Sequence, residues 1–134
     1  MGAAKLRRLS VSGATYLWKV ASTRSHDGRS SIALTVYLDG RTLAPLNITF
    51  DTWDDPVVGN PLNSGWRIPD AIGEVQPLSL HRPRIVAELI GAALAAGWSP
   101  ETARTALRID DGLGLLSQLG YPIDSLRPSG SGRR

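Results

Sequence analysis

Apolar and polar residues alternate over most of the first fifty positions, which is the period of a β-strand with one buried face. Residues 6–22 predict a β-hairpin that turns at Ser12 and Gly13, and Tyr16 and Trp18 share one face of its second strand. The same alternation therefore predicts both the strands and the side that faces the core.

A second hairpin is predicted between residues 32 and 50, because Asp39-Gly40 is a strong turn signal between two alternating runs. Pro45 has no N–H to give to a strand ladder, so the fourth strand should lie at an edge or carry a bulge. Four strands with short connections predict an antiparallel meander with one apolar face that needs cover.

Residues 83–97 predict the covering helix. Pro83 suits a first helical turn, Gly97 suits a left-handed cap, and Pro100 prevents continuation. The apolar positions recur at intervals of three and four: Ile85, Val86, Leu89, Ile90, Ala93 and Leu94. The uncharged stretch after Glu88 runs for twelve residues, from Leu89 to Pro100. A helix that crosses a bilayer needs about twenty apolar residues, so we expect no membrane contact.

After this helix, residues 105–109 predict a short strand, and Asp110 and Asp111 can cap a brief helix that ends near Gly120. The predicted fold class is therefore α+β: a four-stranded antiparallel meander covered by one amphipathic helix, then a short strand and a short helix. We expect a single domain over residues 1–124 and a flexible tail over residues 125–134.

Charge and cysteine content narrow the classes of function. The chain has no cysteine, which excludes disulfides and thiolate chemistry. Its pI is near 9.8, but without the terminal Lys5, Arg7, Arg8, Arg133 and Arg134 there remain 10 basic residues against 12 acidic ones. This distribution disfavours nucleic acid as the partner, and the basic termini keep it as an alternative. Without a signal peptide, the expected compartment is the cytoplasm.

Catalytic and metal-binding motifs are sparse. The two histidines, His26 and His81, have no partner that the sequence identifies, and no phosphate loop or nucleophile elbow is present. Asp51, Asp54 and Asp55 form a carboxylate cluster, which leaves an enzyme with an unrecognised site as a further alternative. The sequence thus predicts no cofactor, no metal and no catalytic residue.

Residues 52–77 contain four prolines, three glycines and two of the four tryptophans. A loop of this length without regular structure is uncommon in a compact domain and is usually functional or disordered, and its apolar residues argue against disorder. The tryptophans either plug the open end of the sheet or anchor a partner. The candidate partner-binding residues are Trp53, Asp54, Asp55, Trp66 and Arg67.

The strand motif Tyr16-Leu17-Trp18 and the helix ending in Gly97-Trp98-Ser99-Pro100 resemble those of a group of small, uncharacterised bacterial proteins, largely actinobacterial. The resemblance covers most of residues 6–109 and implies a shared fold, without a catalytic residue or a function. The segment after Asp110 departs from the usual short ending of that group.

The predicted function is a non-enzymatic protein-binding accessory, such as a regulator, an immunity-type protein or an assembly partner, that uses the loop at residues 52–77. Another protein is the expected partner. The small residues on the second side of the predicted helix, among them Gly91 and Ala95, leave room for a homodimer.

Overall fold

The computed structural model describes residues 6–24, 29–53, 60–64, 66–69, 75–121 and 123–127. Along the chain the elements are β1 (Arg7–Val11), β2 (Ala14–Arg24), β3 (Arg29–Leu38), β4 (Arg41–Trp53), α1 (Pro61–Ser64), β5 (Trp66–Pro69), β6 (Val75–Leu78), α2 (Pro83–Ala95), β7 (Leu107–Ile109), α3 (Gly112–Gln118) and the 3-10 turn η1 (Asp124–Leu126). The fold class is α+β, as predicted.

The main sheet has five strands in the order β1-β2-β3-β4-β7. The first four strands pair antiparallel with their sequence neighbours, whereas β7 pairs parallel to β4 over Leu46–Ile48. The sheet is therefore mixed and one strand wider than the predicted meander. A parallel neighbour needs a long crossover, which residues 54–106 supply, and a strand of three residues carries too weak a pattern to reveal its pairing.

Pro45 lies in a bulge, which was one of the two predicted outcomes. Val36 pairs with Leu46 but Leu38 pairs with Arg41, so residues 42–45 of β4 lie opposite Tyr37 alone. The missing N–H of Pro45 therefore interrupts no regular pairing. The other outcome, an edge position, is wrong because β7 lies outside β4.

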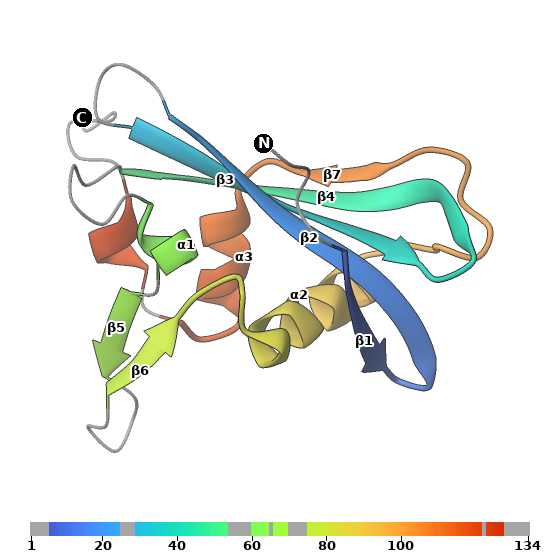
Figure 1. Cartoon of the computed structure of the whole chain (residues 1–134), viewed down its shortest axis with the longest axis horizontal. Helices are drawn as coiled ribbons and strands as arrows, with labels where there is room; N and C mark the ends of the chain where they lie inside the picture. The colour runs from blue at the N-terminus through green and yellow to red at the C-terminus, as the bar shows by residue number, and fades with distance from the viewer. Residues whose placement is uncertain are drawn as a thin grey trace.

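The helices lie on one side of the sheet, below it in Figure 1. The even-numbered side chains between residues 16 and 20 of β2, 32 and 38 of β3, and 44 and 50 of β4 point to this side. They form the core with α2, whose buried residues are Ile85, Val86, Leu89, Ile90 and Ala93. The helix ends as predicted: Gly97 has φ +114°, and the N–H of Trp98 donates to the Ala93 carbonyl at 2.9 Å. Trp98 then packs on Tyr16 and donates from Nε1 to the carbonyl of Ala44 in the bulge.

The cover consists of two helices, where the sequence predicted one. α3 begins directly on the sheet, because a Cβ placed at Gly112 would lie 2.4 Å from the ring of Phe50. Asp111 caps this helix as predicted, since its carboxylate accepts from the N–H of Gly114 at 3.0 Å. Gly112 is thus needed for close approach of the helix and the strand.

The predicted tail boundary at residue 125 falls inside the packed structure. Leu126 is fully buried, and Ile123 is 5% exposed, so both belong to the core. A single leucine next to a Ser/Gly-rich ending gives no periodic signal, which is why the sequence pattern placed Leu126 outside the domain.

Candidate protein-binding site

The predicted site residues fall at the end of β4 and in β5. Trp53 is the last residue of β4; it pairs with Arg29 of β3, is half-buried and packs against the core. Trp66 and Arg67 open β5, where they pair with Leu78 and Pro77 of β6. Asp54 and Asp55 lie outside the described residues. The described contacts of Trp53 are those of a residue that closes the end of the core.

Part of the expected loop has regular structure. β5 and β6 form a separate two-stranded antiparallel sheet, and α1 precedes it. We call α1, β5 and β6 the arm; its strands lie apart from the five-stranded sheet in Figure 1. Pro69 and Pro77 sit in these strands, which is tolerated because both strands of a two-stranded sheet are edges. The same prolines made the sequence read as a loop.

Three leucines attach the base of the arm to the core. Leu62 of α1 and Leu80, just beyond β6, are fully buried, and Leu78 at the end of β6 is 1% exposed. The N–H of Leu80 donates to the carbonyl of Leu62 at 2.9 Å, which joins the two ends of the arm. This anchor matters because an isolated two-stranded sheet is marginally stable at best.

A buried polar chain fixes the arm to the main sheet. Asn60 is 4% exposed; its side-chain oxygen accepts from the N–H of Leu62, and its Nδ2 donates to Oγ of Ser30, both at 2.9 Å. Ser30 in turn donates to the carbonyl of Thr23 at 2.9 Å. Asn60 therefore caps α1 and connects it to β2 and β3. Sequence reasoning missed this residue, although an Asn before a Pro is a recognised helix-start signal.

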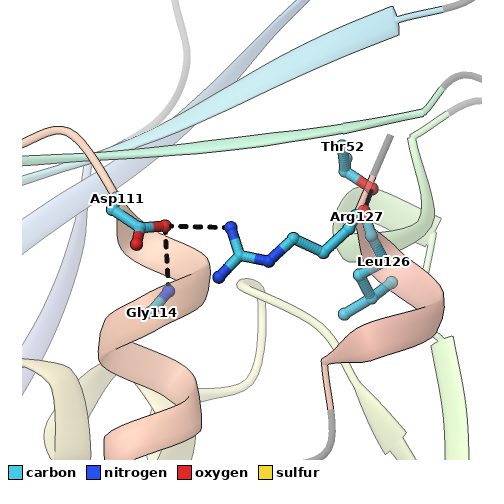
Figure 2. Close-up of polar contacts among 5 residues, drawn as sticks. All are labelled: Thr52, Asp111, Gly114, Leu126 and Arg127. Atoms are coloured by element: carbon cyan, nitrogen blue, oxygen red, sulfur yellow. Dashed lines mark hydrogen bonds and ion pairs between the residues drawn. The ribbon is translucent and has the colours of Figure 1, made fainter. Parts of the chain in front are cut away.

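The C-terminal turn supports the same end of the core. The hydroxyl of Thr52 donates to the carbonyl of Leu126 at 2.5 Å in a buried hydrogen bond. Figure 2 shows Arg127 reaching from this turn to Asp111 at the start of α3, where Nη1 and Oδ1 are 3.3 Å apart. The segment after α3 thus closes the core between β4 and α3.

The remaining predicted chemical groups have structural contacts. Asp51 accepts a hydrogen bond from the hydroxyl of Ser31 at 2.6 Å, and its predicted companions Asp54 and Asp55 lie outside the described residues, as does His26. Burial, followed by the charge of Arg7, lowers the pKa of His81. Among the described residues no group of three or more acidic or histidine side chains has the arrangement of a metal site.

Tyr121 and Glu88 connect the segment after α3 to α2. The Tyr121 hydroxyl donates to Oε1 of Glu88 at 2.6 Å, and Arg84 lies 3.6 Å from the other oxygen of the same carboxylate. Burial, the hydrogen bond to Glu88 and the charge of Glu88 raise the pKa of Tyr121 to about 12. The group is neutral at physiological pH and holds two covering elements together.

The chain matches no protein-family model, no curated protein and no solved structure. Within the part that the structure describes, no helix has both the length and the apolar character needed to cross a membrane.

Proposed function

We propose that the protein is a non-enzymatic protein-binding accessory of the cytoplasm, such as a regulator, an immunity-type protein or an assembly partner, and that it docks its partner through the arm. Membership of the small actinobacterial group named above is part of the same proposal. The observation that carries it is a two-stranded sheet held outside the main sheet by a dedicated anchor.

The anchor supports a role for the arm beyond closing the fold. Leu62, Leu78 and Leu80 lie at its base, so the core contacts of its described side chains are made where the arm begins and ends. Neither β5 nor β6 is a strand of the five-stranded sheet. An element that is ordered without contributing a strand to the main sheet is well placed to present side chains to a partner.

The residue types at the start of β5 suit such a role. Trp66 and Arg67 are consecutive, and tryptophan and arginine are the residue types most enriched at energetically dominant interface positions.

A double substitution, Trp66→Ala with Arg67→Ala, tests the proposal. Partners captured on the full chain from the cytoplasm of its native host would be identified by mass spectrometry and titrated against purified variants. We expect the double variant to bind at least about 30-fold more weakly, which corresponds to about 2 kcal/mol. The matched control, Arg104→Ala with Gln118→Ala, changes two exposed residues outside the arm and should bind normally.

Thermal melts of the same variants distinguish the two roles that the tryptophans can have, which are to plug the open end of the sheet or to anchor a partner. If the arm presents a binding surface, the Trp66/Arg67 variant keeps the melting temperature of the wild type. A large fall in melting temperature with unchanged affinity measured in the cold would make the arm a structural plug and the proposal wrong.

A further inference from the structure

The five-stranded sheet has a second face on which no described element packs. This outer face consists of the odd-numbered positions of β2 and β3, of residues 43, 47, 49 and 51 of β4, and of Arg108 of β7, and it lies opposite the helices in Figure 1. We propose that the outer face is the interface of a symmetric homodimer, a role separate from that of the arm.

Exposed apolar side chains gather on this face. The described residues leave two large hydrophobic side chains exposed, Leu6 at 52% and Leu43 at 59%. Leu43 lies in the bulge opposite Tyr37, which pairs with Leu17. The register of β1 with β2 places Leu6, one residue before β1, beside Lys19 and not in this row. Leu17, Tyr37 and Leu43 therefore form an apolar row across β2, β3 and β4 at one end of the outer face, and Arg8 of β1 lies beside it. Exposed apolar side chains that lie together favour an interaction site.

Small side chains in the middle of the face would let a second sheet approach closely. Ala33 pairs with Ala21 on one side and with Thr49 on the other, so the central row carries two alanines and a threonine. Packed sheets lie about 10 Å apart with strand directions within about 30°, and small side chains in the central row leave room for such an approach.

The two rows that flank the central row through Ala33 carry opposite charges. In the row through Thr35, Lys19 lies on β2 and Arg108 lies on β7, beyond Asn47. Among the described residues neither cation has an ion-pair partner. The row through Ser31 carries Asp51, which is exposed.

This arrangement is complementary to itself under a two-fold axis. The row through Thr35 and the row through Ser31 each lie two residues from the row through Ala33, on opposite sides of it. A two-fold axis that runs along the central row therefore places the Thr35 row of one copy against the Ser31 row of the other. Arg108 of each copy then faces Asp51 of the other, one strand to the side, within the reach of an arginine side chain. Symmetric dimers are the commonest oligomers and need this kind of self-complementary patch.

The size of the face sets the expected strength. The four spacings of about 4.8 Å between five strands, and the eight steps of about 3.3 Å from Arg29 to Tyr37, give roughly 500 Å² per copy. Because a standard stable interface takes about 800 Å² from each partner, the dimer should be weak and dissociate in the micromolar range or above.

Sedimentation equilibrium of the full chain from about 5 to 500 μM tests the interface. We expect a monomer–dimer equilibrium for the wild type, and at least a tenfold larger dissociation constant for Asp51→Arg and for Arg108→Asp, each of which brings like charges together. The double variant, which restores opposite charges, should return to within about threefold of the wild type.

The control Arg104→Asp makes the same charge change as Arg108→Asp at an exposed position outside the sheet, and it should leave the dimer unchanged. Circular dichroism melts establish that each variant is folded. A wild type that stays monomeric at 500 μM, or a double variant that fails to recover, would overturn the dimer. A monomer whose outer-face variants lose a captured partner would assign the face to that partner instead.

Discussion

The five-stranded sheet and the arm both contain antiparallel strand pairs, but they are stabilised in different ways. The buried side chains of the sheet form a continuous core with α2 and α3, whereas the arm is attached through Leu62, Leu78, Leu80 and the polar contacts of Asn60. Among the described side chains, those of the sheet are buried along its inner face and those of the arm are buried at its base. Substitutions should therefore affect the two regions with different size and reach.

The largest effect should come from the helix under the sheet. Leu89 is fully buried, so Leu89→Asp places an unpaired charge in the core and should cost more than about 4 kcal/mol, enough to abolish cooperative unfolding. Gly91→Asp is the control on the same helix, because Gly91 is exposed and its Cβ position is open. A near-native melt of Leu89→Asp would mean that α2 does not cover the sheet.

The C-terminal turn should show an intermediate effect that reaches the sheet. Leu126→Ala should lower the free energy of unfolding by about 2–5 kcal/mol, since it leaves a cavity beside β4. Arg127→Ala removes only the ion pair with Asp111, in which both side chains are largely exposed, and should cost less than about 1 kcal/mol. Urea unfolding of the two variants checks this, and equal losses would contradict the buried position of Leu126.

A smaller and more local effect is expected at the base of the arm. Asn60→Ala removes the cap of α1 and the hydrogen bond to Ser30, which should cost about 1–3 kcal/mol. Amide exchange should accelerate at Leu80 before it changes in β3, because β5 and β6 pair with no strand of the main sheet. Asn47→Ala on the outer face is the control, and exchange that rises equally in both regions would show that the arm and the sheet unfold together.

The smallest effect depends on pH and concerns the contact between Tyr121 and Glu88. The pKa of Tyr121 is about 12 in the folded protein against 10.0 as its ordinary value, so above pH 10 the unfolded chain loses this proton first. Stability should fall as the pH rises from 10 towards 12. Tyr121→Phe should flatten that fall in melts at pH 9 to 11, and an unchanged slope would assign the loss to other groups.

The elements with strong local signals could be predicted, and those that depend on distant contacts could not. The alternation around Tyr16 and Trp18, and the stop at Gly97, are local, and the structure confirms the strands and the helix they predict. The prediction of a short strand and a capped helix after residue 105 is also confirmed. The parallel pairing of β7 depends on Leu46, some sixty residues earlier, and no local pattern encodes it.

The candidate site was predictable only in part. The sequence predicted that residues 52–77 pack, because their apolar side chains would be costly to leave in water. The structure describes residues 52–53, 60–64, 66–69 and 75–77 of this segment. The sequence did not predict the arm, because Pro69 and Pro77 are residues that disfavour strands. The contact between Asn60 and Ser30 joins residues thirty positions apart, and only the folded chain brings them together.

Hydrogen exchange of the full chain, with and without its captured partner, tests the binding role of the arm most directly. We expect the partner to slow exchange in residues 66–69 and 75–78, while β2, β3 and α2 exchange as they do in the free protein. Protection concentrated on the strands of the main sheet, with the arm unchanged, would contradict the proposed function.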